Sequence, residues 1–161
     1  FAMQPSALSL PDSIVSHADL ARIERELRQI AENNRQAHLV GRAATPAHHM
    51  SAELRELALQ LSLDAGRASD QDQLLSALSW LKDAAPQVHV SFAAPPTEAA
   101  VIQLVRWFRL HANPSTLLKV SVKPSLVGGC VIRTGNKVFD FGFEKLLHAA
   151  APTLQKRVGA L

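Results

Sequence analysis

Apolar residues in the first half of the chain recur at helical spacing, at steps of three and four residues. Four of them share one face of the first predicted helix, which a Ser-x-x-Asp pair at Ser16 and Asp19 can cap: Leu20, Ile23, Leu27 and Ile30. The stripe is as narrow as a coiled-coil seam, because charged residues occupy the opposite face. It predicts one partner helix, from this chain or from another, so we treat these four as candidate partner-binding residues.

Two more helices are expected before the pattern changes. Ser51 can cap the second, and Gly66 is expected to stop it. Ser69 opens another Ser-x-x-Asp start for the third, which Pro86 ends. These signals predict a helical domain of about three helices over residues 12–85.

From residue 88 on, the pattern alternates as in strands. Residues 88–92 and 117–122 each predict a strand. Between them, Pro95-Pro96-Thr97 opens a helix and Asn113-Pro114 closes it. The short links predict a parallel pair of strands joined by a right-handed crossover.

Glycines punctuate the next stretch. Gly128-Gly129 marks a sharp turn, and residues 130–134 and 137–141 form two strand-like runs around Gly135-Asn136, the two-residue spacing of a hairpin. A terminal helix is expected to begin near Glu144.

The expected fold is α+β, with a small all-helical N-terminal part followed by a βαββ domain with a β-hairpin and a C-terminal helix over residues 86–161. The chain has 161 residues, 47% of them hydrophobic, as in a globular protein. It lacks tyrosine, so the core should be aliphatic, and Trp80 and Trp107 are expected to pack. No apolar run is long enough to span a membrane, and no secretion signal precedes the fold, which indicates a cytoplasmic chain.

Charge divides the chain. Residues 1–84 hold eight Lys and Arg against eleven Asp and Glu, whereas residues 85–161 hold nine against three. The basic half suits an acidic protein surface or nucleic acid. A nucleic-acid-binding module would need aromatic platforms and four cations on one sheet face: Lys119, Lys123, Arg133 and Lys137.

No phosphate loop is predicted. Gly129 and Gly135 are six residues apart, where a Walker motif has five, and Asn136 stands where that motif has lysine. The glycines are therefore interpreted as turn residues, and no cofactor-binding residue is expected.

Reactive groups are few. The single Cys130 could act as a nucleophile if His89 or His111 approached it, which leaves a small enzyme as an alternative. His48 and His49 are adjacent and have no nearby partner ligand in the sequence, so no metal site is expected. No catalytic residue is assigned.

At this point the second half resembles the C-terminal domain of the ATP synthase delta subunit, whose mitochondrial counterpart is the oligomycin-sensitivity-conferring protein. That family shows a strand, a helix, a strand, a Pro-x-Leu-x-Gly-Gly element, a β-hairpin, an Asp and a Leu-containing helix. The resemblance covers about residues 86–150. The matching residues here are Pro124, Leu126, Gly128, Gly129, Gly135, Asp140 and Leu146.

Two departures from the family stand out. The family has an Asp-x-Ser string, and Gly142 replaces its Ser here. The family's N-terminal domain has about six helices, against about three predicted here, so this part is shortened or divergent.

The resemblance implies a non-catalytic peripheral-stalk (stator) subunit of a rotary F-type ATP synthase, active in proton-driven ATP synthesis. It would link the alpha subunits of the catalytic head to the b subunits of the stalk, with no cofactor and no small-molecule substrate. It would lie peripherally at the cytoplasmic side of the cell membrane without direct lipid contact. The nucleic-acid-binding module stays open as the alternative.

Overall fold

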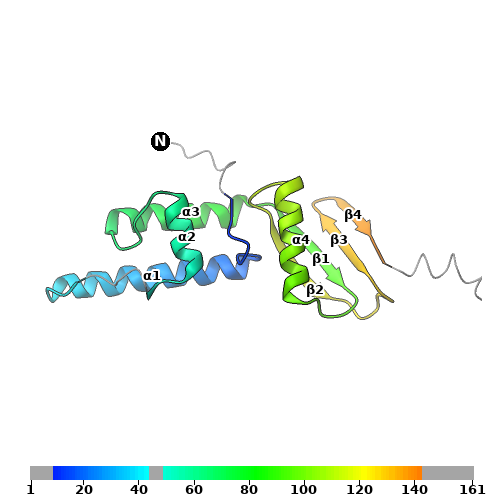
Figure 1. Ribbon diagram of the computed structural model, residues 1–161, viewed down its shortest axis with the longest axis horizontal. Helices are drawn as coiled ribbons and strands as arrows, with labels where there is room; N and C mark the ends of the chain where they lie inside the picture. The colour runs from blue at the N-terminus through cyan, green and yellow to red at the C-terminus, as the bar shows by residue number, and fades with distance from the viewer. Residues whose placement is uncertain (1–8, 44–48, 143–161) are drawn as a thin grey trace, which may run out of the picture. The chain divides into compact units, whose positions relative to one another are not determined.

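The computed structural model describes residues 9–43 and 49–142 and groups them in two compact units (Figure 1). The helical unit takes in the described residues up to Pro86 together with Ile102–Leu117. The sheet unit takes in Gln87–Val101 and the described residues from Leu118 on. Leu146 and the expected C-terminal helix lie outside the described residues, and the domain bounds 12–85 and 86–161 remain a prediction.

Three helices form most of the helical unit: α1 (His17–Leu39), α2 (Ala52–Gln60) and α3 (Ala68–Ala84). The predicted start of α1 is confirmed as a capping box. The Ser16 N–H donates to the Asp19 carboxylate at 2.9 Å, and the Asp19 N–H donates to Ser16 Oγ at 3.4 Å. The predicted cap of α2 is also confirmed, because Ser51 Oγ accepts the Leu54 N–H at 3.3 Å.

The expected stop of α2 at Gly66 is wrong, because the helix ends at Gln60. Ser62 takes a left-handed φ of 55°, and the Leu63 N–H donates to the Ala58 carbonyl at 2.9 Å. This is a Schellman ending with serine in the position that glycine usually occupies. A serine there gives no recognisable stop signal in the sequence.

The expected start of α3 at Ser69 is also wrong. The helix begins at Ala68 after Arg67, which makes no side-chain cap. Ser69 Oγ instead donates to Asp70 at 2.9 Å.

The residues proposed as a partner-binding seam are buried inside their own chain. They belong to one core cluster with apolar residues of α2 and α3. The seam residues are Leu20, Ile23, Leu27 and Ile30. Their partners are helices of the same unit, so the assignment of these four residues to partner binding is wrong.

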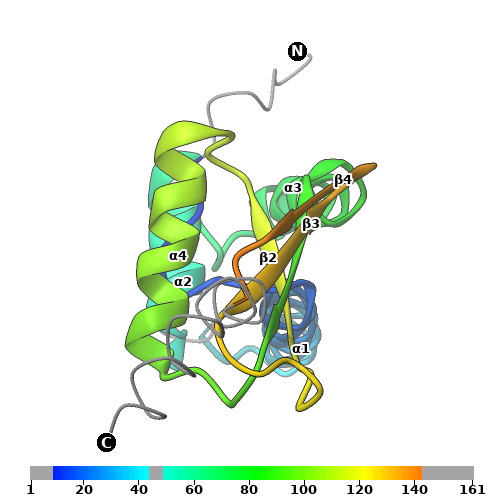
Figure 2. The same ribbon diagram turned by 90° about the vertical axis from the view of Figure 1, so that its right-hand side faces the viewer.

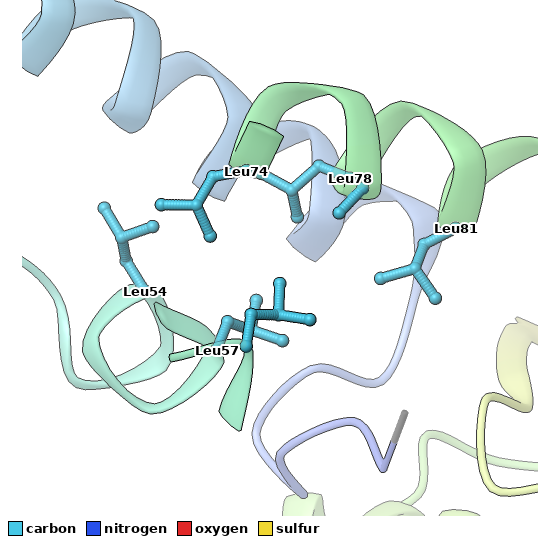
Figure 3. Close-up of a pocket in the computed structure, with 7 residues that line it drawn as sticks. Leu54, Leu57, Leu74, Leu78 and Leu81 are labelled. Atoms are coloured by element: carbon cyan, nitrogen blue, oxygen red, sulfur yellow. The ribbon is translucent and has the colours of Figure 1, made fainter. Parts of the chain in front are cut away.

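A small void lies in this core between α2 and α3. Its volume is about 10 Å³, room for about one water molecule, so it is a packing gap and not a ligand site. Leucines that face one another across it are labelled in Figure 3: Leu54, Leu57, Leu74, Leu78 and Leu81.

One half-buried arginine fixes the segment before α1. Arg109, on α4 (Glu98–His111), donates to the backbone carbonyls of Leu10 at 3.1 Å, Pro11 at 2.8 Å and Ile14. It also donates to the Thr116 carbonyl at 3.2 Å. Burial lowers the pKa of Arg109 to about 10, so the guanidinium stays charged at neutral pH. A single side chain thus joins two parts of the helical unit that lie far apart in the sequence.

The sheet has four strands in the order β2-β1-β3-β4: β1 (Gln87–Phe92), β2 (Leu117–Val122), β3 (Cys130–Thr134) and β4 (Lys137–Asp140). The N–H groups of Leu117 and Lys123 donate to the carbonyls of Pro86 and Phe92. Each donor lies equally far along the chain from its acceptor, so β1 and β2 are parallel, as predicted.

The remaining pairs are antiparallel. β3 pairs with β1 on one side and with β4 on the other, and Figure 2 shows β3 and β4 side by side. Thr134 and Lys137 flank Gly135-Asn136 as register partners, which confirms the predicted hairpin. The α+β fold class is confirmed.

Acidification should destabilise the helical unit through Glu24. This carboxylate lies 2.9 Å from Lys82 Nζ on α3 and 2.6 Å from Arg28, and these two cations lower its pKa. A lowered folded-state pKa stabilises the fold above the unfolded value near 4.5, and that contribution is lost as the pH falls. Glu24→Gln should therefore lower the free energy of unfolding at pH 7 by up to about 1 kcal/mol, and by nothing near pH 2. Urea titrations at the two pH values measure this.

Glu32→Gln, on the same helix, is the control for Glu24→Gln. Glu32 pairs with Arg35 on the surface of α1, and both side chains are largely exposed. This variant should change stability less than Glu24→Gln at pH 7. Equal effects of the two substitutions at pH 7 would contradict a special role for the bridge to Lys82.

Candidate partner-binding surfaces

The family-signature glycines shape the point where β4 returns to the start of β3. Gly129 has a φ of +82°, and a Cβ placed on it would lie 2.2 Å from the Phe141 carbonyl oxygen. The Gly129 carbonyl accepts the Ala93 N–H at 3.2 Å, and the Phe141 N–H donates to the Cys130 backbone carbonyl at 2.9 Å. Only glycine lets the two backbones approach this closely.

The structure brings part of the signature together. Gly128 and Gly129 lie beside the segment that holds Asp140, because the Gly128 carbonyl oxygen lies 3.6 Å from a Cβ built on Gly142. Gly135 marks the opposite end of the hairpin, with a φ of +52°.

The first two signature residues, Pro124 and Leu126, lie in the loop between β2 and β3. The Leu126 N–H donates to the Lys123 carbonyl at 3.0 Å, which closes a turn around Pro124.

Gly142 keeps a local turn without the family's serine. Its N–H donates to Asp140 Oδ1 at 2.9 Å. A Cβ at this position would lie 2.9 Å from the same Oδ1, a side-chain atom that can move. This turn uses only the backbone N–H of residue 142, so it forms without a side chain at that position.

Strand register divides the cations of the sheet between its two faces. Alternation puts His89 and its β3 partner Arg133 on one face, together with Lys119. Lys137 pairs with Thr134, a residue of the other face. Lys119, Lys123, Arg133 and Lys137 therefore do not share one face, and the arrangement that the nucleic-acid alternative needs is not formed.

The aromatic residue of β4 also lies away from the main group of cations. Phe139 pairs with Ile132, which in turn pairs with Val90, so Phe139 shares the face of Lys137. The strand residues around Lys119 and Arg133 therefore offer no aromatic platform for a base.

The pair of Cys130 with His89 that the small-enzyme alternative requires is not formed. Cys130 pairs with Phe92, which by alternation lies on the face opposite to His89. His89 Nε2 instead lies 2.9 Å from Ser121 Oγ. Burial raises the pKa of the Cys130 thiol, which keeps it protonated and weakly nucleophilic.

The other histidine considered for Cys130 is engaged on its own helix. His111 stacks on the Trp107 ring with centroids 4.8 Å apart, and its Nδ1 lies 2.9 Å from the Trp107 carbonyl oxygen. Within residues 9–43 and 49–142, no three His, Cys, Asp or Glu side chains are grouped to hold a metal ion. His48 lies outside these residues.

Two large apolar side chains of α4 face solvent. Trp107 is 54% exposed and Leu110 is 81% exposed, and we call this pair the α4 ridge. Val105 and Phe108 turn the opposite side of the helix inward. The expectation that Trp80 and Trp107 pack holds only in part: the Trp107 ring contacts Phe108 and His111, but about half of its side chain is exposed, and Trp80 is 42% exposed. Exposed tryptophan is enriched among residues that dominate protein interfaces.

A groove of about 400 Å³ lies between the C-terminal part of α1 and the start of α3. Arg35, His38 and Arg42 line it, together with Leu39, which is 82% exposed. Asp72 also lines the groove, so its lining is charged and apolar, and it is a second surface of the helical unit on which a protein segment could pack.

Comparison with known proteins agrees with the signature. The sequence pattern of the family "ATP synthase delta (OSCP) subunit" matches residues 53–154, more than half of the chain. The match begins in the first turn of α2, so it adds α2 and α3 to the resemblance found in the second half and leaves out α1.

Two relatives carry the same family name. The ATP synthase subunit delta of Geobacter metallireducens is 33% identical over 101 residues, which are 61% of this chain and 56% of that protein. The ATP synthase subunit delta of Laribacter hongkongensis is 35% identical over 66 residues, which are 41% of this chain and 37% of that protein. The matched part thus spans about half or less of each relative. Among the described helices, none has the length and apolar character to cross a bilayer. The family match over residues 53–154 shows that the chain belongs to the ATP synthase delta (OSCP) subunit family.

Proposed function

We propose that this chain is a non-catalytic peripheral-stalk subunit of a rotary F-type ATP synthase, linking the alpha subunits of the catalytic head to the b subunits of the stalk. The observation that carries the proposal is the family match over residues 53–154. In this role the protein lies at the cytoplasmic side of the cell membrane as part of the complex, without direct lipid contact. It supports proton-driven ATP synthesis by holding the head against the turning rotor.

The described surface suits a connector. A stator subunit needs lasting contacts with two partners, and such contacts form where exposed apolar anchors enter a complementary groove. The α4 ridge offers such anchors, and the groove beside Leu39 offers a receptor for an anchor from a partner. The opposite net charges of the two halves of the chain favour different partners for each and speed their encounter.

Binding titrations test the proposal. The full chain is titrated against the isolated catalytic head and, separately, against the C-terminal segment of the b subunit. Binding to both supports the connector role. Binding to one partner alone contradicts a link between them, and binding to neither means that the fold is shared without the function.

Trp107→Ala should weaken binding to one of these two partners by at least about fivefold, because truncation of an interface tryptophan commonly costs more than about 1 kcal/mol. Stability should change little, since more than half of the side chain is exposed. Leu59→Ala, at an exposed position of α2, is the control and should leave both affinities unchanged. If Trp107→Ala changes neither affinity, the α4 ridge is not an anchor.

A further inference from the structure

One face of the sheet carries a row of basic residues across three adjacent strands. The Leu117 N–H donates to the Pro86 carbonyl, and the strands β1 and β2 run parallel from there. In this register Lys119 of β2 lies beside His89 of β1. His89 is in turn the register partner of Arg133 on β3. We call Lys119, His89 and Arg133 the cationic row.

The side chains next to the row support this register. Ser121 Oγ, on β2, lies 2.9 Å from His89 Nε2 and 3.0 Å from Ser91 Oγ. The side chains of these three residues therefore point to the same face. Val138 of β4 extends the row as the partner of Arg133 and is exposed. The row therefore ends in an apolar contact point.

The charges of the row are available to a partner. Lys119 and Arg133 are exposed, and neither takes part in the ion pairs formed among described residues. Among the described strand residues, Asp140 is the one carboxylate on this face. It is the register partner of Val131, beside the row, and it accepts the Gly142 N–H. The face is therefore positive at neutral pH.

We propose that the cationic row is a docking surface for an acidic helix that lies across the strands. Adjacent strands are about 4.8 Å apart, and successive turns of an α-helix rise about 5.4 Å. Carboxylates on three successive turns of one helix face would thus meet Lys119, His89 and Arg133 in order. The match of spacing and charge identifies the kind of partner, and it does not depend on the proposed stator role.

Single-stranded nucleic acid fits this surface less well. Its binding relies on bases stacked upon aromatic rings, and the described strands place no Phe, Tyr or Trp on this face. An acidic helix needs only the two exposed cations on either side of His89 and an apolar end contact, both of which are present.

The test uses the full chain and a labelled alanine-rich peptide of about 20 residues, long enough to be helical in water. The peptide carries glutamates on successive turns of one face, and fluorescence anisotropy measures its binding. Lys119→Gln and Arg133→Gln should each weaken binding about fivefold, the effect of an exposed ion pair worth about 1 kcal/mol. Lys137→Gln removes the same charge from the opposite face and should weaken binding less than about twofold.

Three results would overturn the proposal. The first is an equal loss with Lys137→Gln, which would mean that only net charge matters. The second is equal binding of a peptide with the same glutamates spread around the helix. The third is tighter binding of a single-stranded DNA oligonucleotide than of the one-faced peptide. Because all three substituted side chains are exposed, circular dichroism should show an unchanged fold in each variant.

Discussion

Replacing Gly129 with alanine should destabilise the sheet unit by about 3–5 kcal/mol. Two effects add. A left-handed φ of +82° is strained for any residue with a Cβ, at about 1–2 kcal/mol. The new Cβ would also lie 2.2 Å from the Phe141 carbonyl oxygen, a backbone atom that cannot rotate away. The segments must therefore separate, which weakens the hydrogen bonds from Ala93 to Gly129 and from Phe141 to Cys130.

Amide hydrogen exchange is the sharpest measurement for this variant, because both tryptophans lie in the helical unit and do not report on the sheet. Protection of the Ala93 and Phe141 amides should fall by several orders of magnitude. Gly135→Ala is the matched control, since Gly135 also has a positive φ but no atom within 4 Å of its added Cβ. It should cost only about 1 kcal/mol. Equal losses in the two variants would mean that backbone strain alone, and not the close approach to Phe141, explains the signature glycine.

Local signals in the sequence predicted most of the elements, because their physical causes are local. The Ser16 and Ser51 caps depend on side chains within three residues of the helix start. The hairpin depends on a two-residue turn at Gly135-Asn136. The order of elements predicted the parallel pair β1–β2, since a helical crossover leaves few other arrangements.

Predictions that required knowledge of distant partners failed. An apolar stripe on α1 shows that something covers it, but the sequence does not say whether that is α3 of the same chain or a helix of another. Trp107 illustrates the reverse case, because a large apolar side chain was expected to be covered and is exposed. Neither outcome follows from spacing along one helix.

The candidate surfaces were harder to predict for the same reason. Whether Lys137 joins Lys119 or opposes it depends on the register of three strand pairs, and a shift of one residue reverses the face. The cationic row therefore becomes visible only when the pairing of β1 with β2 and with β3 is known. Exposure of the α4 ridge likewise depends on which side of α4 packs, which Val105 and Phe108 decide in the folded unit.

Leu27→Ala should lower the free energy of unfolding of the helical unit by about 2–5 kcal/mol. Leu27 is fully buried, in one cluster with leucines of α2 and α3. The substitution removes apolar contacts and leaves a cavity that the surrounding helices fill only partly. Urea denaturation followed by the fluorescence of Trp80, on α3 of the same unit, measures the loss.

Leu39→Ala makes the same chemical change on the same helix at an 82% exposed position and should cost less than about 0.5 kcal/mol. The comparison separates two roles for the stripe on α1. A seam that waits for a partner helix would tolerate Leu27→Ala in the free chain and lose affinity for that partner. A seam already filled by α2 and α3 loses stability before any partner is added. Equal stability of Leu27→Ala and Leu39→Ala would restore the partner-binding assignment that burial of the stripe contradicts.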